Sequence, residues 1–600
     1  MELLRATALF GRLDDGALRR IEAEVEQVGV PGGALVMQEG DPADCLYIVA
    51  SGRLRVTVER SPGVEEAVGE VGPGESVGEM ALLIGGQRSA TVRAIRDSQL
   101  LRLSKASFDQ LLHRAPGIAM ELARMLVVRL QQTLHAGRRA ASPTTIALVA
   151  ASKDIPLGHF ARALTSVLLG LRPVEHIDSA AVERELGKGA AQTPADHPDN
   201  ARIVRWLNEQ EARAQFVLYE ADAVPSEWTT RCLRQADRIL VVARADGVPS
   251  MGEVEAGLWA DADRSAVPKE LVLLHDPMTG HPARTKAWLA PPRQFQIHHH
   301  LRPGSDDDLA RLARMVSGQA VGLVLGGGGA RAFAHIGVIQ AFREAGIPID
   351  LIGGTSMGAV IAAQYAMGWD QRAMCEATRR AFLESGSLFD YTLPLMSLIG
   401  GRRFARTLGE MFGGTSIEDL WVKYFCVSTN LTRGEQVVHE TGLLRRWLCA
   451  SITVPGLAPP LFHDGDLLVD GSVLNTVPAD IMRRFARGPV VAVDVTARVD
   501  VGADAAFRDT PSGWQLLRSR LDPFKPRLRA PTLYKILLRT TMLSSAQSVK
   551  RLKDSVDLYI QPPVEGFELL DWKAMDRIVD LGYRAGHKAV GAWQRDAVGW

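Results

Sequence analysis

Short hydrophobic runs recur through the chain, separated by glycine-bearing turns and by stretches of helical periodicity. In the C-terminal half, the runs at residues 321–325 and 349–352 each lead through glycines into a helical pattern, and a third run ends at Asp470. Strands that alternate with helices form sheets covered by helices, so this pattern predicts an α/β domain over residues 320–495. Residues 496–600 are expected to form a helical C-terminal extension of that domain.

The N-terminal part has a different pattern, with short alternating runs punctuated by glycine at residues 45–49, 52–58 and 90–94. Such spacing predicts a small β-roll or barrel. Helical patterns precede it at residues 14–28 and follow it at residues 104–136. The first domain is therefore predicted to be a β-roll with flanking helices over residues 1–137.

The middle of the chain, residues 143–317, again alternates apolar runs with helical stretches. This βαβ pattern predicts a second α/β domain with a parallel sheet, whose strand candidates are residues 145–149, 216–219, 238–242 and 270–274.

The turn after the first of these strands, residues 150–158, has the position of a phosphate-binding loop. Such a loop requires glycines and a Gly-Lys-Ser/Thr sequence. Here Lys153 comes too early and Gly158 is the only glycine of the segment. We interpret the domain as a degenerate nucleotide-binding-like fold that serves as a scaffold.

Three consecutive histidines at residues 298–300 suggest a metal tract. No Cys, Asp or Glu stands at ligand spacing beside them, so we predict a polar turn and no metal site. Residues 303–308 are expected to link the middle domain to the next.

A candidate nucleophile stands after the second C-terminal strand. Ser356 is flanked two residues on either side by Gly354 and Gly358, at a strand-to-helix turn, which is the pattern of a nucleophile elbow. The earlier glycine run, residues 326–329, can direct backbone N–H groups at a developing oxyanion. A nucleophile together with an oxyanion hole indicates acyl transfer, most simply hydrolysis.

The base that activates Ser356 has to be chosen among several groups. His587 and His463 lie in a polar helical stretch and in a hairpin turn, and His335 is expected to pack inside the helix after the glycine run. Asp470 is the best candidate, because burial raises the basicity of a carboxylate enough for it to act as a general base.

The segments 327–331, 354–358 and 470–471 resemble, in order and spacing, those of the patatin-like phospholipase family, over residues 321–495. The resemblance implies a three-layer α/β/α fold and hydrolysis of acyl esters of phospholipids and lysophospholipids without a cofactor. It assigns Ser356 as nucleophile and Asp470 as base, with an oxyanion hole formed by Gly327, Gly328 and Gly329 beside Arg331. Ser472 departs from the family pattern, which often has glycine there.

A second set of residues, inside the β-roll, resembles the phosphate-binding cassette of cyclic nucleotide-binding domains. A short helix starting near Glu79 would offer backbone N–H groups to a phosphate, and Arg88 would pair with it through a planar guanidinium. The resemblance implies cAMP or cGMP as a regulatory ligand, held by Gly78, Glu79, Arg88, Ser89 and Ala90.

The order of the three domains resembles that of the neuropathy target esterase group of lysophospholipases. Residues 228–237 and 450–461 also carry this resemblance. The sequence shows one nucleotide-binding module and no run that would form an N-terminal transmembrane anchor, so we do not expect constitutive membrane residence.

Composition limits the partners and the location. Lys+Arg and Asp+Glu both number 69, so the net charge of zero argues against nucleic acid as a partner. The five cysteines are scattered, which favours a reducing compartment. No apolar run is long enough to span a bilayer, and the N-terminus is too charged for a signal peptide. We expect a cytoplasmic protein, peripheral at the inner membrane face.

The sequence therefore predicts a serine esterase of lysophospholipids or phospholipids, regulated by a cyclic nucleotide. Two alternatives stay open. One is a cyclic-nucleotide sensor whose hydrolase domain serves as a binding platform, and the other is a hydrolase of neutral lipids or small esters.

Overall fold

A computed structural model describes residues 7, 10, 15–61, 64–114, 144–260, 267–384, 390–486, 488–496, 553 and 555–597. Its contacts divide the chain into two units. The first comprises residues 1–274 with 288–301, and the second comprises residues 275–287 with 302–600. Helix α11 (Thr285–Trp288) lies where the chain passes from one unit to the other.

The first part of unit 1 is a β-roll, as predicted. Its described strands pair in two antiparallel sheets, ordered β1-β8-β3-β6 and β2-β7-β4-β5, around two small apolar clusters. The strands are β1 (Glu26–Val30), β2 (Leu35–Met37), β3 (Cys45–Ser51), β4 (Leu54–Ser61), β5 (Val64–Val71), β6 (Ser76–Val77), β7 (Thr91–Ala94) and β8 (Ser98–Ser104), and the helices are α2 (Asp15–Glu24), α3 (Glu79–Ile84) and α4 (Lys105–Arg114).

The helix expected over residues 14–28 is wrong at its C-terminal end. Helix α2 stops at Glu24, and residues 26–30 form β1, because Val28 and its neighbours pair antiparallel with β8. Tertiary pairing here outweighs the local helical pattern. The helix predicted for residues 104–136 is present as α4 up to Arg114, and its remainder lies outside the described residues.

The second part of unit 1 contains a parallel sheet, as predicted. Its described strands run in the order β10-β11-β9-β12-β13-β14. They are β9 (Thr144–Ala150), β10 (Val174–Ile177), β11 (Phe216–Glu220), β12 (Arg238–Arg244), β13 (Lys269–Leu274) and β14 (Ile297–Leu301), with helices α6 (Leu157–Leu169), α7 (Ser179–Leu186), α8 (Asn200–Arg213), α9 (Glu227–Gln235) and α10 (Glu253–Ala260) and the 3₁₀ turn η1 (Ala190–Gln192).

The polar turn predicted for residues 298–300 is wrong, because these histidines lie inside β14. His299 and His300 are buried, and His299 Nε2 is 2.9 Å from Glu270 Oε2 on the neighbouring strand. Pairing with β13 and this carboxylate satisfy a strand that looks polar in sequence. Among the residues that the structure describes, no group of three His, Cys, Asp or Glu side chains is arranged to hold a metal ion.

Buried ion pairs join the two parts of unit 1. Arg96, in the turn between β7 and β8, is 1% exposed and hydrogen-bonds Glu211 of α8 and Asp237, which precedes β12. The next residue, Asp97, forms an ion pair with Arg234 of α9, with Arg234 Nε 3.0 Å from Asp97 Oδ1. Charges buried in this way are found paired because an isolated buried charge is very costly.

Unit 2 is built on a mixed sheet. Its described strands follow the order β19-β20-β17-β16-β15-β21-β22, with β18 paired to β17. Within this order, the neighbours β17-β16, β16-β15, β15-β21 and β21-β22 are parallel. The strands are β15 (Gly322–Leu325), β16 (Leu351–Thr355), β17 (Lys423–Asn430), β18 (Glu435–His439), β19 (Leu461–His463), β20 (Asp466–Asp470), β21 (Val490–Val493) and β22 (Leu558–Ile560).

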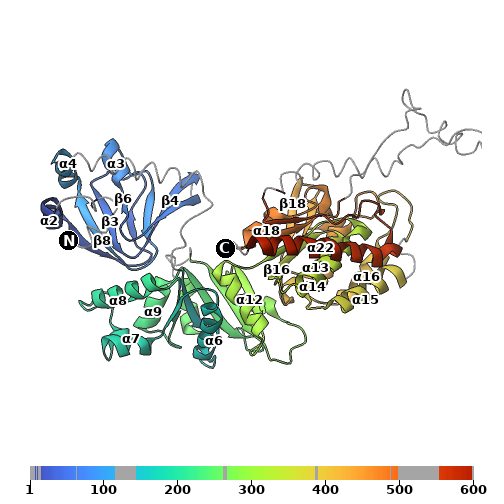
Figure 1. The fold of residues 1–600 in the computed structure, drawn as a ribbon, viewed down its shortest axis with the longest axis horizontal. Helices are drawn as coiled ribbons and strands as arrows, with labels where there is room; N and C mark the ends of the chain where they lie inside the picture. The colour runs from blue at the N-terminus through green and yellow to red at the C-terminus, as the bar shows by residue number, and fades with distance from the viewer. Residues whose placement is uncertain are drawn as a thin grey trace, which may run out of the picture. The chain divides into compact units, whose positions relative to one another are not determined.

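Helices and short turns complete unit 2 around a large apolar core (Figure 1). They are α12 (Asp306–Ser317), η3 (Gly329–Phe333), α13 (Ala334–Glu344), α14 (Met357–Ala366), α15 (Gln371–Arg379), the π-helical η4 (Arg380–Glu384), α16 (Arg402–Phe412), η5 (Ile417–Asp419), α17 (Leu444–Ile452), η6 (Gly471–Val473), α18 (Ala479–Phe485), η7 (Trp572–Ala574) and α22 (Met575–Ala597).

The end of the chain is part of this core. Strand β22 extends the sheet beside β21, and α22 lies along α13 (Figure 1). The two helices approach through glycine: a Cβ placed on Gly582 would come within 2.0 Å of the Ala334 carbonyl oxygen. The expected helical extension thus also supplies a strand. The domain boundaries themselves stay a prediction.

The linker expected over residues 303–308 ends earlier than predicted. Ser305 caps α12 by accepting from the N–H of Asp308, so residues 306–308 already form the first helical turn. Through Arg314, which pairs with Asp350 at 2.7 Å, α12 groups with unit 2 rather than with the middle domain.

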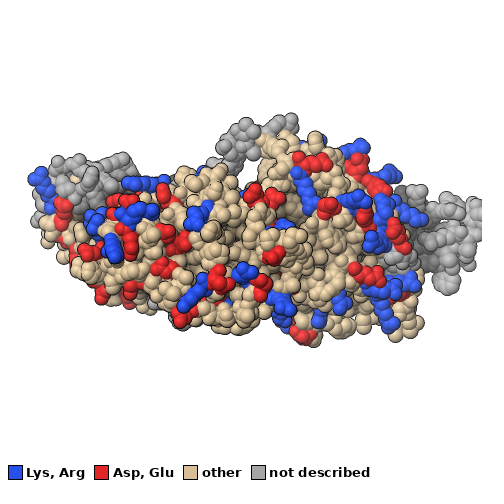
Figure 2. All heavy atoms as spheres, turned by 90° about the horizontal axis from the view of Figure 1, so that it is seen from below, with Lys and Arg blue, Asp and Glu red and all other residues tan. Residues whose placement is uncertain are grey.

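Two features bear on the predicted partners: the distribution of surface charge and the length of the apolar helices. On the face seen in Figure 2, acidic and basic side chains are interspersed. In the described parts of the chain, the structure contains no helix that is both long and apolar enough to cross a bilayer.

Candidate active site

Ser356 occupies a strained turn between β16 and α14. Its φ of 55° lies in the left-handed region, which a non-glycine residue adopts only where the surrounding structure enforces it. Its N–H donates to Ser451 Oγ at 2.9 Å, and Ser451 Oγ donates in turn to the Val427 carbonyl at 2.7 Å. The turn predicted from the glycine spacing is therefore present, and Ser451 anchors it.

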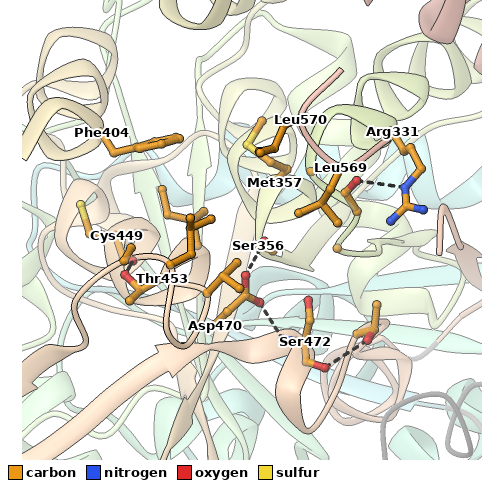
Figure 3. A pocket seen from close by; sticks show the side chains of 18 of the residues that line it. Arg331, Ser356, Met357, Phe404, Cys449, Thr453, Asp470, Ser472, Leu569 and Leu570 are labelled. Carbon is orange, nitrogen blue, oxygen red and sulfur yellow. Dashed lines mark hydrogen bonds between the residues drawn. The ribbon is translucent and has the colours of Figure 1, made fainter. Parts of the chain in front are cut away.

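Asp470 faces Ser356 from the end of β20 (Figure 3). Ser356 Oγ donates to Asp470 Oδ2 at 2.7 Å, and the N–H of Ser472 donates to Asp470 Oδ1 at 2.8 Å. Asp470 is 2% exposed, and this burial raises its pKa to about 6, while hydrogen bonds from Ser356 and Ser472 act in the opposite direction. The carboxylate is thus a stronger base than an exposed aspartate.

The histidines lie away from this pair. His335 is fully buried in α13, within 2.8 Å of the Gly326 carbonyl oxygen, and burial lowers its pKa to about 4. Its packing inside the helix is as predicted. His463 ends β19 before the turn with Asp464 and contacts Trp447 edge to face.

The glycine loop passes directly beside Ser356. A Cβ on Gly327 would lie 2.4 Å from Ser472 Oγ and 3.2 Å from Ser356 Cβ, so glycine is needed for this approach. The N–H of Gly327 already donates to the Thr476 carbonyl at 3.1 Å. Within the described part of the chain, no backbone carbonyl accepts from the N–H of Gly328 or Gly329.

Arg331 stabilises the same loop through a hydrogen bond to its backbone. Its Nε donates to the Gly328 carbonyl at 3.2 Å, and the side chain is 7% exposed. In a trans peptide the C=O and the following N–H point in opposite directions. By fixing the Gly328 carbonyl, Arg331 also fixes the direction of the Gly329 N–H.

A cavity of about 670 Å³ opens beside the pair (Figure 3). Its floor includes Ser356, Asp470 and the glycine loop. Most of its other walls are apolar, formed among others by Ile399, Phe404, Ile452, Leu457, Leu569 and Leu570. A site of this size and lining suits an acyl chain. The sequence did not reveal Leu569 and Leu570, which come from the C-terminal extension.

The second predicted site, in the β-roll, is also assembled around one loop. Gly78, with φ of 91°, precedes α3, and Glu79 is buried. Arg88 is 4% exposed and donates through Nη1 to the Gly78 carbonyl at 3.2 Å and through Nη2 to Asp44 Oδ1 at 3.1 Å. Ser89 is exposed and Ala90 is half-buried, directly after Arg88 in the chain.

The degenerate loop of the middle domain lies against a carboxylate. A Cβ on Gly158, at the start of α6, would lie 3.0 Å from Glu220 Oε1. Glu220 is held there by His176, whose Nε2 is 2.9 Å from Oε2. A negative charge in this place opposes phosphate binding, which agrees with a scaffold role for the domain.

Comparison with known proteins identifies the class. A family model of the patatin-like phospholipases matches residues 323–483, and one of the cyclic nucleotide-binding domain matches residues 27–115. Residues 142–306 match the Neuropathy Target Esterase family P-loop like domain. The chain belongs to the patatin-like phospholipases, and within them to the neuropathy target esterase group.

Individual relatives agree with this assignment. "Patatin-like phospholipase domain-containing protein 6" of Homo sapiens is 33% identical over 97% of this chain and 46% of its own length. "Lysophospholipase NTE1" of Cryptococcus neoformans var. neoformans is 32% identical over 96% of this chain and 39% of its own length. The chain thus spans less than half the length of each of these relatives.

A solved structure matches part of the chain. The regulatory domain of Toxoplasma gondii PKA, crystallised with cAMP, is 34% identical, covers 18% of this chain and 42% of its own, and has a TM-score of 0.18.

Proposed function

We propose that this protein is a serine esterase that hydrolyses acyl esters of lysophospholipids or phospholipids through a Ser356–Asp470 dyad. The observation that carries the proposal is the 2.7 Å hydrogen bond from Ser356 Oγ to the buried Asp470 carboxylate. Asp470 takes the hydroxyl proton as Ser356 Oγ attacks the ester carbonyl, which gives a tetrahedral intermediate and then an acyl-enzyme. Water activated by Asp470 releases the fatty acid.

The oxyanion is stabilised by the glycine loop. Gly328 and Gly329 are the proposed donors, since the Gly327 N–H is engaged by Thr476. Gly327 contributes by allowing the loop to approach Ser356, and Arg331 by orienting the Gly329 peptide. Pre-oriented donors of this kind supply a large part of the rate enhancement in acyl transfer.

The substrate class follows from the cavity and from the family. Its apolar walls suit one fatty acyl chain next to Ser356. A relative whose name is lysophospholipase supports a single-chain phospholipid as the first substrate to test. The three-layer α/β/α arrangement of the domain is part of the proposal, supported by α13 and α14 following the parallel strands β15 and β16.

Replacing the nucleophile tests the dyad. Ser356→Ala should lower the turnover of lysophosphatidylcholine by at least about 10³-fold, since an essential covalent nucleophile is lost. Asp470→Asn should be nearly as damaging, and His463→Gln should leave turnover within a few-fold. The measurement is fatty-acid release by folded variants, with circular dichroism as the control. A Ser356→Ala variant that kept about a tenth of the wild-type turnover would rule out this nucleophile.

We further propose that the β-roll binds cAMP or cGMP and regulates the hydrolase. The support is the matched cyclic nucleotide-binding model together with the buried Arg88 beside the Gly78 turn. In this proposal Arg88 pairs with the cyclic phosphate and Glu79 accepts from a ribose hydroxyl, with Ser89 and Ala90 completing the pocket wall. Regulation requires that the nucleotide bind one domain arrangement better than another.

Titration calorimetry on the full chain tests the binding. Arg88→Ala should weaken cAMP or cGMP binding by roughly 1.5–3 kcal/mol, the range of hydrogen bonds to charged groups. Asp44→Asn is the matched control, because it removes the same ion pair and leaves the guanidinium in place. Absence of heat with both nucleotides would make the module a structural relic, and binding without a change in turnover would leave it without regulatory output.

A cytoplasmic location, peripheral at the inner membrane face, is also proposed. The support is the five cysteines, all of which are unpaired thiols in the structure. Fractionation of cells that express the chain tests this location: recovery only from a compartment outside the cytoplasm would contradict it.

A further inference from the structure

Next to the active-site cavity, one loop exposes a group of large apolar side chains. In residues 391–398, here called the apolar loop, the exposed fractions are 81% for Tyr391, 72% for Leu393, 88% for Leu395, 58% for Met396 and 43% for Leu398. Single exposed apolar residues are common on protein surfaces, but so many in one short segment mark an interaction site.

The apolar loop is held in this position by its own base. Tyr391 and Ile399 form an antiparallel bridge, and the N–H of Gly400 donates to the Asp390 carbonyl at 2.8 Å. The Asp390 carboxylate accepts from the N–H groups of Gly401 and Arg402 at 3.0 Å each. The apolar side chains are therefore presented by a closed loop instead of collapsing onto the core.

The same base forms a wall of the cavity. Ile399, which follows the loop, is 1% exposed and lines the cavity with Gly400 and Gly401. The N–H groups of Leu398 and Ile399 donate to the carbonyls of Gly456 and Leu457, in a segment that also lines it. The exposed apolar surface is thus continuous with the wall that would receive the acyl chain.

Basic side chains accompany the apolar loop. Directly after it, α16 begins with Arg402 and Arg403 and continues to Arg406, and all three are exposed. Arg445 and Arg446 are exposed at the start of α17, which packs on α16 beside Gly409. Of the acidic groups in this region, Glu410 is 3.8 Å from Arg406, and Asp390 is engaged by backbone N–H groups. Apolar side chains beside an excess of arginine fit the interface of an anionic bilayer.

We propose that the apolar loop inserts into the surface of a phospholipid bilayer that contains anionic lipid, and that it places the cavity at the lipid from which the substrate is drawn. This inference rests on the proposed lipid esterase function for its choice of occupant. The apolar side chains enter the acyl boundary, while the arginines of α16 and α17 remain at the level of the headgroups.

The experiment measures co-sedimentation of the full chain with vesicles of phosphatidylcholine and phosphatidylglycerol. The Leu393→Ser/Leu395→Ser variant should lower partitioning at least about tenfold, because less apolar area enters the lipid. Its turnover of a soluble short-chain ester should equal that of the wild type, since neither residue lines the cavity. Met278→Ser, at a side chain 89% exposed outside the loop, is the matched control and should partition as the wild type does.

The arginines give a second, independent readout. Arg402→Gln/Arg406→Gln should weaken binding to vesicles with phosphatidylglycerol and make it less dependent on salt. Equal partitioning of the wild type and the loop variant, or an equal loss for Met278→Ser, would overturn the proposal. A concentration-dependent dimer that the loop variant abolishes, without any change in vesicle binding, would overturn it in favour of a second copy of the chain.

The Ser356→Ala variant separates this inference from the proposed function. It should bind vesicles as the wild type does, although its turnover is lost. A wild-type chain that binds vesicles through the loop but hydrolyses no lysophospholipid would contradict the esterase proposal alone. A wild-type chain that hydrolyses vesicle-bound lysophospholipid while the loop variant shows no loss of binding or of vesicle turnover would contradict the loop alone.

Discussion

At the scale of single residues, burial decides what Asp470 can do. The sequence suggested Asp470 as base because no histidine stood in a suitable position, but it gave no measure of basicity. The structure supplies the cause: the carboxylate is almost fully buried, and this desolvation outweighs the hydrogen bonds that it receives from Ser356 and Ser472. Its pKa of about 6 keeps it ionised at neutral pH while leaving it able to take a proton.

The raised pKa of Asp470 has a predictable effect on stability. Because the folded pKa is about 6 and the reference value is 3.8, the folded state binds this proton more tightly than the unfolded state does. The stabilisation is complete below pH 3.8 and is lost as the pH rises through about 6. Asp470→Asn should therefore gain stability over the wild type across this window, on the order of 3 kcal/mol in total. Urea unfolding at several pH values measures the difference.

Ser356→Ala is the control for this measurement, because it is equally inactive but keeps the buried carboxylate. Its stability should still fall as the pH rises, but at higher pH than in the wild type, because the hydrogen bond from Ser356 that lowers the Asp470 pKa is gone. Parallel unfolding curves for the wild type and Asp470→Asn between pH 4 and pH 7 would show that the carboxyl group is not desolvated as described.

At the scale of secondary-structure elements, the sequence predicted the parts that depend on local pattern. The strand before Ser356, the strand ending at Asp470 and strands β9, β11, β12 and β13 of the middle domain carry apolar runs. Strand β10 (Val174–Ile177) has two polar residues among its four and was not predicted. Strand β14 was missed because its three histidines look polar, and Glu270, which satisfies His299, is distant in sequence. The C-terminal extension was predicted to be helical, as α22 is, but strand β22 was missed for the same reason: its partner β21 lies far back in the chain.

The contact between α13 and α22 connects the C-terminus to the active site. Helix α13 begins directly after η3, which carries Arg331, so its position also sets the glycine loop. Gly582→Ala would place a methyl group against the Ala334 carbonyl. Overpacking of this kind should cost roughly 1–3 kcal/mol of stability and lower turnover as the loop shifts. Thermal unfolding and ester turnover are the measurements.

Gly591 on the same helix provides the matched control for that substitution. A Cβ there meets no atom within 4 Å, so Gly591→Ala should be neutral or stabilising by up to about 1 kcal/mol. Equal effects of the two substitutions would show that helix propensity, and not the close approach of α13, determines the result.

At the scale of the whole molecule, unit 1 is held together by buried charge. Arg96 is surrounded by Glu211 and Asp237, and Tyr219 donates to the other oxygen of Glu211 at 2.7 Å. Burial, together with the adjacent Glu211 carboxylate, holds the pKa of the Tyr219 hydroxyl well above its usual range. Sequence patterns gave no sign of this network, because its members come from three separate segments. A buried network of this kind is geometrically demanding, which suits a fixed contact between the β-roll and the α/β part of unit 1.

Removing one member of the Arg96–Glu211 ion pair should lower the stability more than replacing both members. Arg96→Ala leaves Glu211 buried without its cation and should lower the free energy of unfolding by about 3–5 kcal/mol. The double variant Arg96→Met/Glu211→Gln removes both charges and should recover a large part of that loss, since neither side chain is then left as a buried charge without its partner. The single variants Arg96→Met and Glu211→Gln and the double variant form a double-mutant cycle, in which chemical unfolding measures each free energy of unfolding. Additive effects of Arg96→Met and Glu211→Gln would show that the two side chains do not interact, and that the β-roll is held to the α/β part by other contacts.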